Sequence, residues 1–198
     1  MEPQNRNWFV VGVAVFFLAS LLAPLNATID YDWTAQPIGE LAGRQNVNSW
    51  VMRAGFVGLG FCVLIDVLQD PKWRWRDWPF LLFGLANIGA GLYRNYSVDA
   101  DTFLNDPMAN AHGWFFIAAA FFLLIGYINR LSSDENRQKI ITSCAIVWLV
   151  SCASLAVSFP NFAGLFDRLG DVGLLVWVVL NPRAAYRDKQ SNPAQNAK

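Results

Sequence analysis

Apolar residues occur along this chain in long blocks, and polar connections separate the blocks. A helix needs about 17–25 mostly apolar residues to cross the hydrocarbon core of a membrane. Six segments approach this length: residues 8–25, 50–68, 78–93, 112–129, 140–159 and 162–180. The pattern therefore predicts an all-α integral membrane bundle of six transmembrane helices.

The last block is the least obvious of the six. From Asp171, its final charge, to Leu180 there are only ten residues, and they form about 15 Å of helix, half the thickness of a bilayer core. To span, the helix must reach back to about Phe162, just after Pro160, a residue type common at helix starts. It then carries Asp167, Arg168 and Asp171 within one half of the membrane.

The charged residues between the blocks indicate how the bundle is oriented. Short cytoplasmic connections are enriched in Lys and Arg, and basic residues follow the second, fourth and sixth blocks, whereas acidic residues follow the first and third. Both termini are therefore expected in the cytoplasm of a cell-membrane protein, with residues 1–187 as one domain and residues 188–198 as a disordered polar tail. The basic residues include Lys72, Arg74, Arg76, Arg130, Arg137, Lys139, Arg183, Arg187 and Lys189, and the acidic ones are Asp30, Asp32, Glu40, Asp99, Asp101 and Asp106.

The first block has a second interpretation, as a secretory signal peptide. A short polar leader containing Arg6 precedes it, and the small residue Ala27 follows it. Its apolar stretch is longer than the usual 7–15 residues of such peptides, and the leader also carries Glu2. These features favour a spanning helix.

Composition narrows the function classes. The chain is 55% hydrophobic, and its 15 basic and 15 acidic residues balance, so a nucleic-acid partner, which attracts excess Lys and Arg, is not expected. Phosphate-loop, dinucleotide and Gly-x-Ser-x-Gly motifs are absent from the sequence, and no cofactor is predicted. A single histidine argues against a zinc site. An aspartate-rich Ca²⁺ or Mg²⁺ site at Asp99, Asp101 and Asp106 is the alternative to a solvated surface.

Small residues cluster in the second and third blocks at spacings of three and four. Such faces let helix backbones approach closely in lipid, so helix packing is the favoured interpretation. A ligand groove lined by bare backbone is the alternative. The residues are Ala54, Gly55, Gly58, Gly60, Gly84, Ala86, Gly89, Ala90 and Gly91.

Charged residues near the extracytoplasmic side form the candidate site. Ionisable groups inside a membrane are costly and usually face the bundle interior with a partner. One interpretation is a pocket that binds an anion through arginines oriented by carboxylates, and the other is an ion-pair network that ties the outer connections to the helix ends. The candidate binding residues are Arg53, Arg94, Arg168, Glu40, Asp167 and Asp171, with the arginines expected to neutralise the acids of the last helix.

Several segments together resemble a known family. Residues 37–42 (PIGELA) and 50–56 (WVMRAGF), Tyr31-Asp32 before them, Asp99 followed by His112, and residues 164–169 (GLFDRL) are similar to the bacterial and archaeal membrane family called domain of unknown function 998. The resemblance covers nearly the whole chain and implies its topology rather than an activity. Where the family commonly has Ser before Glu-Leu, this chain has Gly39, so it cannot use a catalytic serine there.

Three functions stay open for such a protein. The leading hypothesis is an uncharacterised multi-pass membrane protein that binds a small anionic molecule or a lipid head group. The second is a membrane enzyme for lipid-linked substrates with His112 and Asp99 as acid and base. The third is a small-solute transporter, although the uninterrupted middles of the helices disfavour it. Membrane lipids are the expected partners, and the sequence does not fix the oligomeric state.

Overall fold

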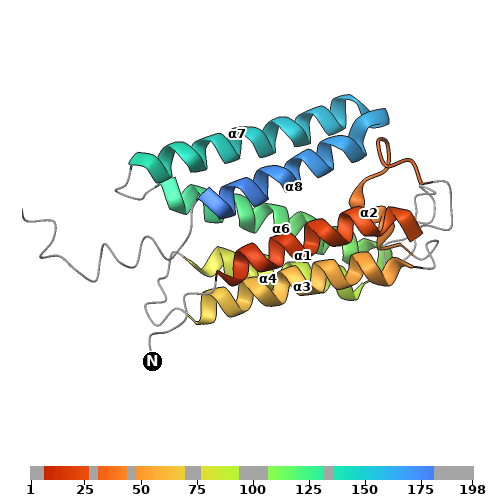
Figure 1. Cartoon of the computed structure of the whole chain (residues 1–198), viewed down its shortest axis with the longest axis horizontal. Coiled ribbons are helices and arrows are strands. Elements are labelled where there is room, and N and C mark those ends of the chain that lie inside the picture. Colours follow the sequence, from red (N-terminus) through yellow and green to blue (C-terminus); the bar gives the residue numbers. More distant parts are fainter. Residues whose placement is uncertain are drawn as a thin grey trace, which may run out of the picture.

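Helices make up almost all of the structure. The computed structural model describes residues 7–26, 31–43, 48–69, 77–93, 107–131 and 136–180. The six long helices are α1 (Trp8–Leu22), α3 (Ser49–Leu68), α4 (Trp78–Leu92), α6 (Pro107–Leu131), α7 (Asn136–Ser158) and α8 (Ala163–Leu180), and a short helix α2 spans Ile38–Leu41 (Figure 1). Single 3-10 turns occur at Pro24–Asn26 and Pro160–Phe162.

Each predicted block contains one long helix, so the expected all-helical fold is confirmed, with changed boundaries. Helix α1 ends at Leu22 rather than residue 25, because a 3-10 turn begins at Pro24. Helices α6 and α7 begin at Pro107 and Asn136, earlier than expected, because helical hydrogen bonding continues into polar turns that a hydropathy pattern does not mark. Helix α8 begins at Ala163, directly after the turn at Pro160, as predicted.

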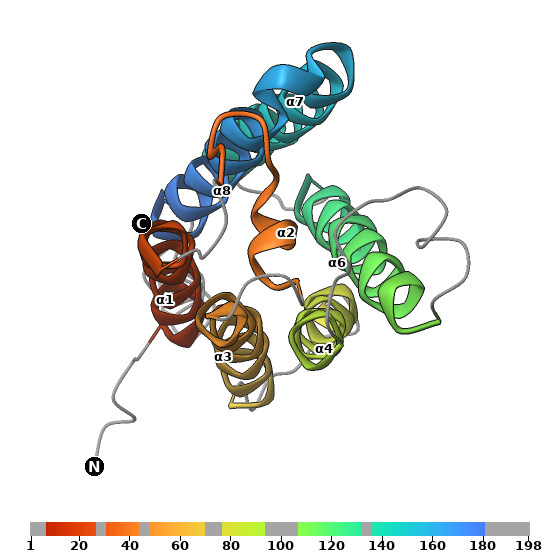
Figure 2. The same cartoon turned by 90° about the vertical axis from the view of Figure 1, so that its right-hand side faces the viewer.

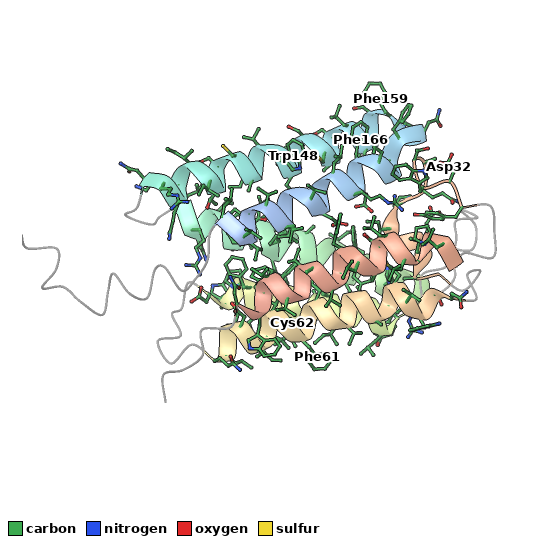
Figure 3. The ribbon with its side chains drawn as sticks, in the orientation of Figure 1. Asp32, Phe61, Cys62, Trp148, Phe159 and Phe166 are labelled. Carbon is green, nitrogen blue, oxygen red and sulfur yellow. The ribbon has the colours of Figure 1, made fainter. Side chains whose placement is uncertain are left out.

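The helices have the composition of a membrane protein. Within the described ranges, three helical stretches are long and apolar enough to cross a membrane: Ser49–Leu68, Ala111–Leu131 and Asn136–Ser158. Helices α1 and α4 are apolar but shorter, at 15 residues each, and α8 has 18 residues including three charged ones. Large apolar side chains are exposed on the outside of the bundle, such as Phe61 on α3 (Figure 3), together with Trp114, Ile117 and Val157.

The six long helices contact one another in a closed order: α1 with α3, then α4, α6, α7 and α8, which returns to α1. Seen end-on, they surround a centre in which α2 lies (Figure 2), and α2 contacts α3 and α8. The start of α1 and the end of α8 lie at the same end of the bundle (Figure 1). The other end, where α1, α4 and α7 finish, is called the α2 end below.

Glycines set the close approach of α3 and α4. A Cβ atom on Gly60 would lie 2.5 Å from the carbonyl oxygen of Gly84, and one on Gly84 would lie 3.0 Å from that of Gly60. A Cβ atom on Gly91 would lie 2.7 Å from the carbonyl oxygen of Arg53. The helix-packing interpretation of these small residues is therefore confirmed.

An aromatic cluster fills the bundle at the end opposite α2. The ring of Trp177 in α8 lies 4.4 Å from that of Tyr127 and 6.0 Å from that of Phe80, centroid to centroid. Phe9 of α1 packs against Phe80 and Trp177 at 6.0 and 6.2 Å. All four side chains are buried. The cluster therefore joins α1, α4, α6 and α8 at this end of the bundle.

Candidate functional site

The connection between α1 and α3 folds against the start of α8. We call residues 31–41 the cap segment; α2 forms its last turn. The N–H groups of Gly164 and Leu165, in the first turn of α8, donate to the carbonyls of Ala35 and Thr34 at 3.3 and 3.0 Å. The first N–H groups of a helix lack acceptors within the helix. The carbonyls of the cap segment are the acceptors for α8.

Arg168 of α8 donates hydrogen bonds to the cap segment. Its Nη1 donates to the carbonyls of Trp33 at 2.7 Å, Gly164 at 2.8 Å and Gln36 at 3.5 Å. Its Nη2 donates to the hydroxyl of Tyr31 at 2.9 Å. The side chain is buried, and the guanidinium carbon lies 5.7 and 5.6 Å from the ring centroids of Tyr31 and Trp33. Both terminal nitrogens of Arg168 therefore donate hydrogen bonds to other groups of the protein.

The cap segment is also bonded within itself. The Tyr31 hydroxyl donates to the carbonyl of Gln36 at 2.7 Å, and burial raises the pKa of Tyr31. Asp32 is exposed at the α2 end (Figure 3). Its carboxylate accepts from the Thr34 hydroxyl at 2.5 Å and from the Thr34 N–H at 2.9 Å, and these bonds lower the pKa of Asp32.

The carboxyl groups at this end have different surroundings. Asp167 Oδ2 accepts from the N–H of Ile38, at the start of α2, at 2.9 Å. Glu40 in α2 is half-buried, and this burial raises the pKa of its carboxyl. Asp171 lies one turn further along α8, and its Oδ2 is buried with no hydrogen-bond partner among the described residues. Asp171 therefore has unused hydrogen-bonding capacity inside the bundle.

Arg53 lies between α3 and α4, away from these acids. Its Nε donates to the carbonyl of Gly91 at 2.8 Å and its Nη2 to that of Leu92 at 3.0 Å, at the end of α4. Among the described residues it forms no ion pair with Asp167 or Asp171. The expectation that it neutralises those acids is wrong, because the last carbonyls of α4, which lack partners in their helix, use its donors.

His112 lies in α6 and, like Arg53, contacts the end of α4. Its imidazole is 1% exposed and packs edge-on against Phe56, with centroids 5.9 Å apart. Nδ1 lies 2.7 Å from the carbonyl oxygen of Ala90 and 3.2 Å from that of Tyr93. Carbonyls only accept, so Nδ1 carries the hydrogen, and Nε2 of the neutral ring is an acceptor. Nε2 is buried with no partner among the described residues.

The predicted site residues thus fall into two groups. Arg53, Arg168 and Asp167 bond to backbone groups, whereas His112 Nε2 and Asp171 Oδ2 are buried acceptors without a described partner. Arg94 and Asp99 lie outside the described residues, as do Asp101 and Asp106. In the described ranges no group of three or more His, Cys, Asp or Glu residues could hold a metal ion.

The cap segment was not expected from the sequence. It lies in a polar connection, and only its buried Ile38 and Leu41 indicate that the chain returns to the core. Tyr31 and Gly164 were noted only as parts of family-like motifs, and both now prove to contact Arg168.

Fold and site together define a multi-pass membrane protein in which a short cap segment is anchored on an arginine of the last helix. A family model described as "Protein of unknown function (DUF998)" matches residues 10–181, and the chain belongs to this family. Comparisons with curated proteins and with solved structures found no match.

Proposed function

We propose that all six long helices cross the cell membrane, with both termini in the cytoplasm, and that the α2 end binds a lipid head group or a small polar molecule from the outside. The basic connections at the opposite end support this orientation. The pocket predicted from the sequence, which takes an anion through its arginines, is one form of this proposal.

One observation carries the binding proposal: Nε2 of His112 is buried and has no hydrogen-bond partner among the described residues. A buried polar atom without a hydrogen bond costs about 1–3 kcal/mol and calls for an explanation such as a ligand or a water. The carbonyls of Ala90 and Tyr93 hold the ring in one tautomer, and this preorganises Nε2 to accept from a bound molecule.

Lipid retention tests the proposal. The protein purified in detergent is expected to retain lipid that native mass spectrometry detects, and His112→Ala is expected to retain about fivefold less, since one hydrogen bond is worth about 1 kcal/mol. Asn87→Ala is the matched control, because Asn87 is equally buried but donates to Phe83 in its own helix. Equal retention by His112→Ala, at an unchanged melting temperature, would remove His112 from the site.

Cysteine labelling tests the orientation. In a variant with Cys62, Cys144 and Cys152 replaced by Ser, Asp32→Cys is expected to react with a membrane-impermeant maleimide on intact cells, because Asp32 is exposed at the α2 end. Ser191→Cys in the C-terminal tail is expected to react only after permeabilisation. The reverse pattern would invert the topology.

A second candidate function is a membrane enzyme that acts on a lipid-linked hydroxyl. The same tautomer favours it, since a neutral imidazole with a free Nε2 is the form in which histidine acts as a general base. The transporter hypothesis has no comparable support from the described residues.

A further inference from the structure

Among the described residues, the two buried side-chain atoms without a hydrogen-bond partner are acceptors, and this bears on the charge of the ligand. His112 Nε2 offers a lone pair, and Asp171 Oδ2 is a carboxyl oxygen. Both lie in the half of the bundle next to α2: His112 about 7.5 Å from the start of α6 and Asp171 about 12 Å from the start of α8, at 1.5 Å per residue. Such atoms are complementary to N–H or O–H donors.

Arg53 and Arg168 have few N–H donors left that could bind an anion. Both described arginines of the candidate site use donors on carbonyls, and Arg168 also donates to Tyr31. Asp167 and Arg168 are adjacent and balance in charge, and Asp167 accepts from Ile38. If both carboxyls are ionised, Asp167 and Asp171 share the single positive charge of Arg168 among the described residues. One negative charge is then left unbalanced, and a buried charge is stable only when it is paired.

The connections between α1 and α3 and between α4 and α6 also carry a net negative charge, which favours a cationic ligand. Residues 27–48 and 94–106 together contain six acidic and two basic residues. An excess of acidic groups at one end of a protein raises the local concentration of cations there and lowers that of anions. This observation comes from the sequence and is independent of the hydrogen bonds of Asp171.

We propose that the ligand presents a primary ammonium group, whose N–H groups pair with Asp171 and also donate to His112 Nε2. The inference rests on the proposed function and fixes the chemistry of its ligand. The ammonium belongs either to an ethanolamine lipid or to a free amine. A quaternary ammonium carries the same charge but no N–H, so it cannot satisfy either atom.

A choice among lipids tests this with the unaltered protein. After exposure to equal amounts of phosphatidylethanolamine, phosphatidylcholine and phosphatidylglycerol, native mass spectrometry is expected to show at least tenfold preference for the first. The choline lipid isolates the role of the N–H groups, and the glycerol lipid tests for an anion site. A rise in melting temperature with free ethanolamine, but not with choline, would identify the free amine as the source.

Asp171→Asn is expected to reduce that preference to near equality without loss of the folded state. Asp77→Asn is the control, because Asp77 is also buried but lies at the opposite end in an ion pair with Arg130. Preference for phosphatidylglycerol, or an amine preference that survives Asp171→Asn, overturns the ammonium proposal but leaves ligand binding at the α2 end intact. If no lipid and no amine depends on His112 or Asp171, both proposals fail.

Discussion

Replacing Arg168 by Gln is expected to lower the free energy of unfolding by about 3–5 kcal/mol. The buried guanidinium serves three carbonyls and the hydroxyl of Tyr31. A Gln side chain has two N–H donors and no charge, so it leaves buried carbonyls unsatisfied and the carboxyls of Asp167 and Asp171 without the cation beside them. Denaturant unfolding in a fixed detergent measures the difference.

Two variants separate charge from geometry in this prediction. Arg168→Lys keeps the charge but lacks the planar fork, so it is expected to recover only part of the lost stability. Arg137→Gln, at the exposed start of α7, is expected to change stability by no more than about 0.5 kcal/mol. If Arg168→Gln unfolds like Arg137→Gln but loses a bound anion, Arg168 is an anion-binding residue, as the sequence analysis proposed.

The helices were predictable because each one satisfies a local condition. In a membrane every backbone polar group needs an internal partner, so a long apolar block is almost bound to be helical. The packing of α3 on α4 was also predictable. Gly60 and Gly84 each belong to a run of small residues spaced three and four apart, and this pattern favours close helix packing whatever the distant residues are. The ends of α6 and α7 were missed because helical hydrogen bonds extend beyond apolar sequence.

The partners of the charged residues were not predictable in the same way. Arg53 lies at the expected level of α3, but its use by the last carbonyls of α4 depends on how two helices are aligned, which no spacing along one helix reveals. For Arg168 the partners come from residues 31–36, more than a hundred positions earlier. The sequence showed that these charges needed partners, and only the fold showed that backbone carbonyls supply them.

The same reasoning separates the two kinds of buried polar residue. From the sequence the arginines were predicted to be binding residues because they were charged, whereas His112 was proposed only as an acid or base in the alternative enzyme function. In the part of the chain that the structure describes, Arg53 and Arg168 donate to backbone carbonyls, whereas Nε2 of His112 has no partner. Unused hydrogen-bonding capacity is a property of the assembled interior, and it points to a ligand more directly than charge does.

Gly164→Ala is expected to weaken the anchoring of the cap segment and to lower the free energy of unfolding by about 1–3 kcal/mol. A Cβ atom at this position would lie 2.3 Å from the carbonyl oxygen of Gln36 and 2.7 Å from that of Trp33. Both are backbone atoms that cannot rotate away, so the cap segment itself must move off α8. Amide hydrogen exchange is therefore expected to accelerate at position 164 and at Leu165, whose N–H groups donate to the cap segment.

Gly170→Ala is the matched control in the same helix. A Cβ atom on Gly170 has no atom within 4 Å, and Ala is favoured over Gly inside a helix by roughly 0.5–1 kcal/mol, so this variant is expected to be at least as stable as the parent. The two substitutions add the same methyl group six positions apart and differ only in what it meets. Equal stability and equal exchange in both variants would mean that residues 31–36 do not rest on the start of α8, and the anchoring by Arg168 would lose its basis as well.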